Sequence, residues 1–265
     1  MALVLTDDET MLVDSLRSLL ARSAPVGAFR ELRDGGDPRR YAPALWSELA
    51  EAGFAAPQVP EAAGGLGMGY AAAGLAAEEM GRVLAATPFV ATAIAIELVL
   101  AAGDEDQQAQ LLPGLLDGSS IATLAIDEAS RHDPDTLAAR ATHDGAGWRI
   151  DGAKRFVLDG GNADWMIVTA ASDDGPLLLL VDARADGVAI TPLDLIDSRN
   201  AADVGFDAVR VDAGAVLGGG NGARAAIDRA LDVGRALLAA ELLGMAQEAF
   251  DRTLAYLKER EQFGQ

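Results

Sequence analysis

The sequence predicts an α+β protein of several domains: an N-terminal helical domain, a central antiparallel β-barrel or sandwich domain, and a C-terminal helical-bundle domain that is truncated. The spacing of apolar residues is helical up to about residue 118, changes to short apolar runs divided by turn residues, and becomes helical again from residue 221. Apolar residues make up 50% of the 265-residue chain, which is enough for a large buried core. We therefore expect domains at 1–118, 119–215 and 216–265.

The first helix is expected to begin at a capping box, in which Thr6 and Glu9 each satisfy a backbone amide of the other. Its apolar residues share one face, at Leu12, Leu16, Leu19 and Leu20. A second helix is expected from Pro43, because proline suits the first helical turn, and Gly53 ends it.

Two Ala-rich helices follow, one through about residue 84 and one over 91–102. The helical pattern continues over 107–116, after an acidic N-terminus at 104–106. Pro113 lies inside that pattern and lacks the amide hydrogen that an interior helical residue donates. We therefore expect the helix to break or kink there.

Seven short apolar runs in the middle segment are typical of strands, at 121–126, 148–150, 155–158, 165–170, 177–181, 188–190 and 204–211. Asp144-Gly145 and Asp151-Gly152 have the sequence of hairpin turns. Six or seven strands at this spacing favour an antiparallel sandwich or barrel over a Rossmann sheet.

The helical pattern that begins at Asn221 carries a single apolar stripe, formed by Ile227, Leu231, Leu238, Leu242 and Met245, and extends to Phe263. Such a stripe left in water would promote aggregation. We therefore expect a natural chain longer than 265 residues, or a partner that covers the stripe.

The overall charge restricts the function classes. There are 21 basic and 41 acidic residues, so the formal net charge is −20, which argues against binding to nucleic acid or to anionic membranes. The chain has no cysteine and only two histidines, neither with ligand spacing, so we expect no disulfide and no metal site. The acidic N-terminus is unlike a secretory signal, and we expect a cytoplasmic protein.

Four motifs follow one another along the chain. The first is Trp46, Leu49 and Gly53 followed by Pro60-Glu61-x-x-Gly64-Gly65-Leu66-Gly67, and the second is Gln108-x-x-Leu111-Leu112-Pro113-x-x-x-x-Gly118. The third is Gly147-x-x-x-x-Gly152-x-Lys154-x-Phe156-Val157-x-x-Gly160-x-x-Ala163-Asp164, and the fourth is Arg235 with Tyr256-x-x-x-Arg260-x-Gln262-Phe263-Gly264. Together, and in this order, they resemble the acyl-CoA dehydrogenase family from one end of the chain to the other.

The resemblance implies FAD as the cofactor and an acyl-CoA thioester as the substrate. The implied reaction is α,β-desaturation: a carboxylate base removes the α-proton while a hydride leaves Cβ for the flavin. It also implies a homo- or heterotetramer with a family-related subunit, and an electron acceptor flavoprotein as a further partner. The acyl chain is left open as linear, branched or steroid-derived.

The residues expected to touch the flavin ring depart from the family pattern. The family's Thr-Glu-Pro-x-x-Gly-Ser-Asp stretch corresponds to the run after Ile126, and Asp127 takes the position of its threonine. An ionised carboxylate accepts hydrogen bonds but donates none. Phe156 takes an aromatic position beside the ring, whereas Leu158 replaces a residue whose hydroxyl donates to it. Ile126, Asp127, Phe156 and Leu158 are therefore candidate cofactor contacts with two donors missing.

The end of the chain keeps its matches. Arg260, Gln262 and Phe263 resemble residues that reach across a subunit interface to a neighbour's FAD, and Arg235 resembles a substrate-binding residue. One subset of the family carries its catalytic glutamate just before this arginine, but here that residue is Gly234. The commoner location lies beyond residue 265, so the catalytic residue is unknown.

Three functions stay open. The chain is a flavin-dependent acyl-CoA dehydrogenase, alone or as one chain of a complex; or it is a non-catalytic partner that lends FAD contacts to another chain; or it is a flavin oxidase or monooxygenase on the same scaffold. Simpler interpretations also exist: Arg260 as a surface ion pair, Phe156 and Phe263 as packing residues, and Arg235 extended into solvent.

Overall fold

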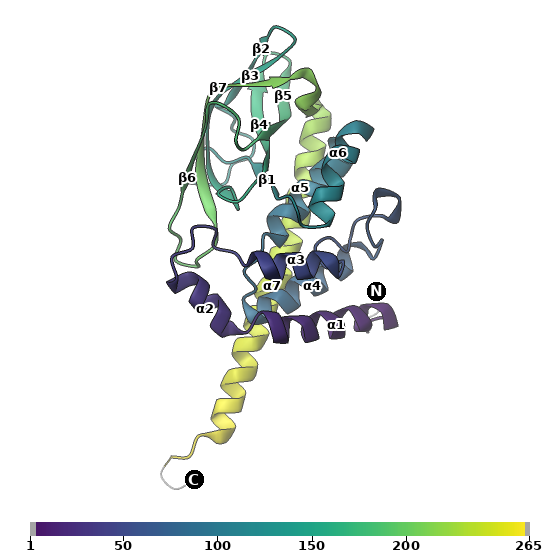
Figure 1. The fold of residues 1–265 in the computed structure, drawn as a ribbon, viewed down its shortest axis with the longest axis vertical. Helices are drawn as coiled ribbons and strands as arrows, with labels where there is room; N and C mark the ends of the chain where they lie inside the picture. Colours follow the sequence, from purple (N-terminus) through teal and green to yellow (C-terminus); the bar gives the residue numbers. More distant parts are fainter. Residues whose placement is uncertain (1–3, 263–265) are drawn as a thin grey trace.

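The described part of this computed structural model, residues 4–262, contains seven α-helices and an eight-stranded sheet. The helices are α1 (Asp7–Ser23), α2 (Val26–Asp34), α3 (Pro43–Glu51), α4 (Gly69–Val83), α5 (Phe89–Ala102), α6 (Glu105–Leu116) and α7 (Gly220–Glu259). The strands are β1 (Ala122–Ala125), β2 (Arg140–Asp144), β3 (Gly147–Leu158), β4 (Trp165–Ser172), β5 (Gly175–Asp182), β6 (Val188–Pro192), β7 (Ala201–Asp212) and β8 (Val216–Gly219). Figure 1 shows the sheet at one end, helices α1 to α4 below it, and α7 running past both.

The start of the helical segment confirms the sequence pattern. Thr6 caps α1 and forms the expected capping box with Glu9, since Glu9 N donates to Thr6 Oγ1 at 3.2 Å and Thr6 N donates to Glu9 Oε2 at 2.8 Å. The predicted stripe of α1 is buried, and α3 begins at Pro43. The helix α2 was not predicted.

Of the break or kink predicted at Pro113, the break is wrong, because α6 continues through Pro113 to Leu116. Asp104 and Gln107 form a capping box at the N-terminus of α6, and Leu111, Leu112 and Leu115 are buried on one face. Pro113 lies in the last turn of the helix and removes one amide hydrogen. Its carbonyl still accepts a hydrogen bond from Asp117 N at 3.0 Å. Burial of the apolar face outweighs that loss.

The predicted barrel is also not found, because the sheet formed by the described residues is open and mixed. Its order is β6-β7-β3-β2-β4-β5-β8, with β1 paired to β4 off this path. β1 runs parallel to β4, and β2 meets β4 through one parallel pairing, whereas the other pairs are antiparallel. The parallel contact arises because β1 enters the sheet directly from the helical segment, next to α5.

Of the two predicted turns, one is confirmed and one is wrong. Asp144 pairs with Gly147 across the β2–β3 hairpin, and Gly145 has the positive φ of 65° that the turn needs. Asp151-Gly152 instead lies inside β3, at a register shift opposite β7. Gly152 has φ 140° there, and a Cβ on it would lie 2.7 Å from Ala139 Cα, so the glycine permits a bulge and a close approach.

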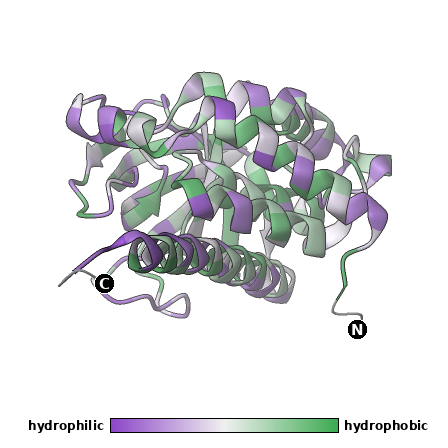
Figure 2. Cartoon of the chain, turned by 90° about the horizontal axis from the view of Figure 1, so that it is seen from below, coloured by the Kyte–Doolittle hydropathy of each residue, from purple (hydrophilic) through white to green (hydrophobic). Residues whose placement is uncertain are grey.

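Helix α7 packs against α4 and α5, and its buried residues lie between Ala223 and Gly244. The predicted stripe divides along its length: Ile227 is buried, whereas Leu242 is 62% exposed. Further exposed apolar side chains follow at Leu243, Phe250, Leu254 and Leu257. In Figure 1 this end of α7 projects beyond α1 and α2, and Figure 2 shows hydrophobic residues along the same helix. Within residues 4–262, no helix combines the length and apolar character needed to cross a membrane.

Candidate functional site

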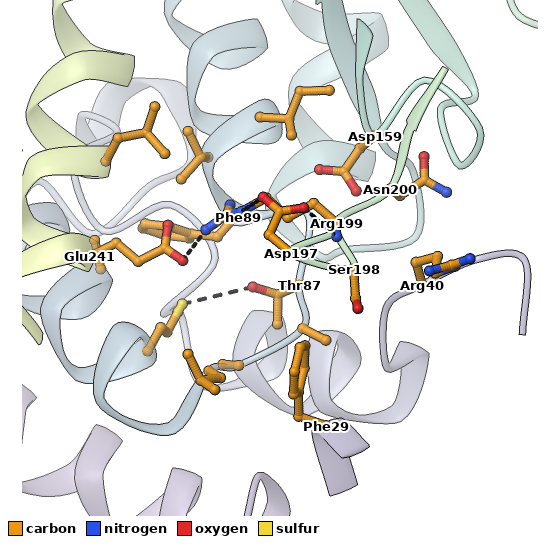
Figure 3. A pocket seen from close by; sticks show the side chains of 18 of the residues that line it. Phe29, Arg40, Thr87, Phe89, Asp159, Asp197, Ser198, Arg199, Asn200 and Glu241 are labelled. Carbon is orange, nitrogen blue, oxygen red and sulfur yellow. Dashed lines mark hydrogen bonds and ion pairs between the residues drawn. The ribbon is translucent and has the colours of Figure 1, made fainter. Parts of the chain in front are cut away.

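A cavity of about 380 Å³ lies where the helical segment, the sheet and α7 meet. Its apolar wall comes from five elements or their ends and includes Phe29, Met80, Phe89, Leu158, Leu238 and Leu242. The polar part of the wall comes from the end of β3, from the loop before β7 and from α7, with Arg40 and Thr87 from the segments before α3 and α5 (Figure 3). The size and the mainly apolar lining are typical of a small-molecule site.

The end of β3 brings Leu158 and Asp159 to the cavity. A register shift between Lys154 and Val157 turns the strand, and both Phe156 (φ 51°) and Asp159 (φ 53°) adopt left-handed backbone conformations. The backbone amide of Asp159 donates to Asn200 O at 2.9 Å, which holds this turn against β7. The Asp159 side chain is therefore placed by backbone geometry.

The Asp159 carboxyl is buried, with only 7% of the residue exposed. Burial raises its pKa to about 7, although the Asn162 amide and the charge of Arg199 oppose that shift. Its hydrogen bond from Asn162 Nδ2 is long, at 3.5 Å, and the same amide group donates to Arg39 O at 2.7 Å. Near neutral pH this carboxyl is poised between its two protonation states.

Arg199 and Glu241 join the loop before β7 to helix α7 across the cavity wall. The Arg199 guanidinium pairs with the Glu241 carboxylate and lies 3.6 Å from Asp197 Oδ2. Figure 3 shows Glu241 approaching from α7 on one side, with Arg199, Asn200 and Asp159 on the other. The ion pair therefore links elements 42 residues apart in sequence.

The segment after β1 carries the predicted contacts Ile126 and Asp127, and both are already engaged within the chain. The carbonyl of Ile126 accepts from Lys154 Nζ at 3.1 Å. The Asp127 carboxylate lies 2.9 Å from His132 Nδ1 and accepts from the Asp133 amide at 3.2 Å. Asp127 therefore holds its own loop together.

A buried ion pair fixes the same segment to the sheet. Lys154 is fully buried, and its ammonium group donates to Glu128 Oε1 at 2.6 Å and to Thr169 Oγ1 at 2.9 Å, besides Ile126 O. Burial lowers the pKa of Lys154, and its bond to Glu128 opposes this shift. Burial also disfavours the charge on Glu128, but Lys154 and two backbone amides outweigh that effect and lower its pKa. Lys154 and Glu128 thus form a hydrogen-bonded pair in the interior of the sheet domain.

Phe156 stands out of the sheet close to this segment and is 45% exposed. Its backbone amide donates to Asp203 Oδ1 at 3.2 Å, while the amide of Arg155 donates to Asp127 O at 2.7 Å. Asp127 is therefore joined through its carbonyl to the residue before Phe156, and Leu158 lies two residues after Phe156, in the cavity.

The predicted residues within and just after α7 lie elsewhere on the molecule. Arg235 is on the exposed side of the helix, paired with Asp232 at 2.7 Å, and does not line the cavity. Gly234 faces α5, where a Cβ would lie 2.6 Å from Ile94 Cδ1. Arg260 caps the end of α7 and lies 5.5 Å from the ring of Tyr256, and Gln262 follows it exposed. Phe263 lies outside the described residues.

Three polar residues of the cavity, Asp159, Arg199 and Glu241, were not singled out from the sequence. One signal was available for Glu241: it interrupts the apolar stripe of α7, three residues after Leu238 and four before Met245. A carboxylate at such a position needs a partner. Asp159 and Arg199 lie at a strand end and in a loop, where acidic and basic residues are common, so they gave no comparable signal.

Two family models match the sequence. Residues 6–119 match the N-terminal domain of acyl-CoA dehydrogenase, and residues 220–265 match its C-terminal domain. Among curated proteins, the acyl-CoA dehydrogenase FadE12 of Mycobacterium tuberculosis is 32% identical over 230 residues, which cover 82% of this chain and 58% of FadE12. The chain therefore spans a little over half the length of that relative.

Solved structures match nearly the whole chain. The Tcur3481-Tcur3483 steroid ACAD G363A variant is 36% identical, with a TM-score of 0.86, over 98% of this chain and 69% of that one. The ChsE4-ChsE5 complex from Mycobacterium tuberculosis is 26% identical, with a TM-score of 0.88, over 99% of this chain and 70% of that one.

Proposed function

Because the chain belongs to the acyl-CoA dehydrogenase family, we propose that it is a subunit of a FAD-dependent enzyme that desaturates an acyl-CoA thioester between its α and β carbons. The observation that carries this proposal is the cavity. It joins the end of β3, where the family resemblance expects the flavin ring, to the apolar ends of α4 and α5 and the middle of α7. An apolar acyl group needs such a wall on the side away from the flavin.

The residues of this chain fit a flavin only in part. Phe156 offers an exposed aromatic ring and Leu158 an apolar surface, which suit one face or edge of an isoalloxazine. The Asp127 carboxylate is already paired with His132, and Leu158 has no donor, so neither side chain gives the ring a hydrogen bond. Bound FAD would supply the hydride acceptor; this chain supplies an apolar support for it and excludes water.

We further propose that the chain works beside a second, family-related subunit, which supplies the hydrogen-bond donors to the flavin that Asp127 and Leu158 do not provide. Gly234 bears on the catalytic base, which one subset of the family carries at this position: the Ile94 side chain fills the space next to Gly234, so a glutamate there would have to displace that side chain. The solved ChsE4-ChsE5 complex gives a precedent for two different chains of this fold in one assembly. In such an assembly Arg260 and Gln262 would contact the neighbour's FAD, with an electron acceptor flavoprotein as the reoxidising partner.

One set of purifications tests these proposals. The chain is prepared alone and co-expressed with a homologous subunit encoded beside it, and FAD content and flavin bleaching by acyl-CoA thioesters are measured for both. The expected result is weak FAD retention and no bleaching for the lone chain, with both restored in the co-purified complex.

Two outcomes would count against the proposals. Stoichiometric FAD with turnover in the lone chain would remove the need for a second subunit. A complex whose flavin no acyl-CoA reduces, but which consumes oxygen with another substrate, would replace desaturation by an oxidase or monooxygenase reaction.

A further inference from the structure

Asp159 is a buried carboxyl in the cavity wall for which the proposed desaturation has no use. Its Oδ1 accepts one 3.5 Å hydrogen bond from an amide that is already committed to Arg39 O, and its Oδ2 accepts none from the described residues. Asp159 lines the cavity, so a ligand there can reach this carboxyl. A ligand group that donates a hydrogen bond to it would gain a favourable contact that the protein does not supply.

The charges around the cavity decide which ligand groups suit it. Three carboxyls, of Asp159, Asp197 and Glu241, line the cavity near one guanidinium, that of Arg199, which already pairs with Glu241. The second arginine of the wall, Arg40, is bound at 2.9 Å to Asp194. The polar wall therefore offers acceptors in excess and no unshared cation for a ligand carboxylate.

The rest of the wall is apolar, with Phe29, Met80, Phe89 and Leu238 facing the same space. A ligand group that fills this cavity must therefore be mainly hydrocarbon, and its one polar contact must be a donor or a neutral group.

The geometry points to a specificity site: the cavity selects an apolar group that carries a neutral hydroxyl, with Asp159 accepting the hydrogen bond from that hydroxyl, and it rejects a carboxylate in the same place. The inference rests on the proposed function, in which this group is part of the acyl moiety of the thioester. The Arg199–Glu241 ion pair contributes to this selection, because Glu241 neutralises the guanidinium that would otherwise attract a ligand carboxylate.

Binding of three small probes tests this without CoA or flavin. Naphthalene, 2-naphthol and 2-naphthoate share one apolar skeleton and differ in a hydrogen, a hydroxyl and a carboxylate. Titration calorimetry of the full 265-residue chain at pH 7.5 is expected to give 2-naphthol a Kd about tenfold below that of naphthalene, the factor that 1.4 kcal/mol makes. 2-Naphthoate is expected to bind more weakly than naphthalene.

The variant Asp159→Asn separates a binding role from a structural one. Asparagine tolerates the positive φ of this position and removes only the charge. We expect the preference for 2-naphthol to fall about tenfold and the affinity for 2-naphthoate to rise, two opposite changes that a folding defect does not produce. Asp173→Asn, at a carboxylate that is 96% exposed at the β4–β5 turn, is the control and is expected to leave all three affinities unchanged.

Equal binding of 2-naphthol and naphthalene, an unchanged selectivity in Asp159→Asn, or no binding of any probe would overturn the inference. Because the probes need neither cofactor nor thioester, a failure of acyl-CoA desaturation would leave these results as they are. The two proposals can therefore fail separately.

Discussion

A carboxyl that is buried beside one shared guanidinium makes the stability of the folded chain depend on pH. The pKa of Asp159 is raised from 3.8 to about 7 in the folded chain. Between these values the folded chain keeps a proton that the unfolded chain has released, so the free energy of unfolding falls as pH rises from about 4 to 7. Above pH 7 the ionised, buried carboxyl lowers the free energy of unfolding by its full amount, about 4 kcal/mol at roughly 1.36 kcal/mol per unit of pKa difference.

Asp159→Asn removes this penalty, so we expect the variant to be more stable than the natural chain at pH 8, by up to a few kcal/mol. The difference should shrink towards pH 5, where the folded carboxyl is protonated. Urea unfolding at both pH values measures it. A difference that is the same at pH 5 and pH 8 would show that Asp159 does not titrate on folding.

The Lys154–Glu128 pair is the second residue-level feature with a measurable consequence. Glu128→Gln keeps a hydrogen-bond acceptor but leaves the ammonium of a fully buried lysine without its counter-charge. Removing one partner of a buried pair costs about 3 kcal/mol or more, and we expect a loss of that order in chemical denaturation.

The double variant Lys154→Met with Glu128→Gln removes the stranded charge and should recover part of that loss. Additive effects of the two substitutions would mean that the pair is not coupled. Arg184→Met is a matched control. The Arg184 side chain is 79% exposed although it pairs with Asp164, so the substitution should change the free energy of unfolding little.

At the scale of elements, the crossing of α4 and α7 depends on two glycines. A Cβ on Gly244 would overlap the carbonyl oxygen of Glu78, and one on Gly81 would overlap that of Glu241. The two helix backbones therefore approach more closely than side chains allow elsewhere. Arg82 adds to the crossing through an ion pair of 2.9 Å with Asp251.

We expect Gly244→Ala to destabilise the chain by about 1–3 kcal/mol, because α7 must move away from α4 to admit the methyl group. Gly222→Ala is the matched control on the same helix: no atom lies within 4 Å of its Cβ position, so alanine should be neutral or slightly stabilising there. Thermal unfolding distinguishes them. Equal melting temperatures of the two variants would contradict the close crossing.

The crossing also bears on the cavity, since Glu241 is one turn before Gly244 on α7. A shift of the helix would move the Glu241 carboxylate relative to Arg199. The fit of α4 against α7 therefore sets the position of Glu241 in the polar wall.

For the whole molecule, the end of α7 is the feature that most directly concerns assembly. Its apolar side chains are exposed, and Arg260 and Gln262 directly follow its last turn. Figure 1 shows this end of α7 projecting beyond α1 and α2. Residues so placed suit contact with a second chain, as the proposed function requires.

We expect Arg260→Ala to weaken FAD retention in the co-purified complex roughly ten- to hundredfold, the effect of losing a charge-assisted phosphate contact of about 1.5–3 kcal/mol. Far-ultraviolet circular dichroism should not change, because the Arg260 side chain only covers the ring of Tyr256. Arg252→Ala, on the same helix and paired with Glu248, is the control. FAD retention that falls equally in both variants would refute a specific role for Arg260.

Much of the fold followed from local patterns. The capping box of α1, the start of α3 at Pro43 and the Asp144-Gly145 turn depend on residues a few positions apart, and all are present. The errors have a common physical origin. At Pro113 and at Asp151-Gly152 a local turn or break signal was overridden by burial against distant elements, α6 on its apolar face and β3 on β7. The strand β2 escaped prediction because its side chains are mostly exposed.

The sequence by itself determined the family and the order of helical and β segments, because each depends on residue identity at fixed spacing. Only the tertiary structure decided that the Asp127 carboxylate hydrogen-bonds to His132 and that the Ile94 side chain packs against Gly234. It also decided that Asp159, Arg199 and Glu241 line one cavity. Those residues come from separate elements, and they meet only because the bulged end of β3 and the close crossing of α7 bring them together.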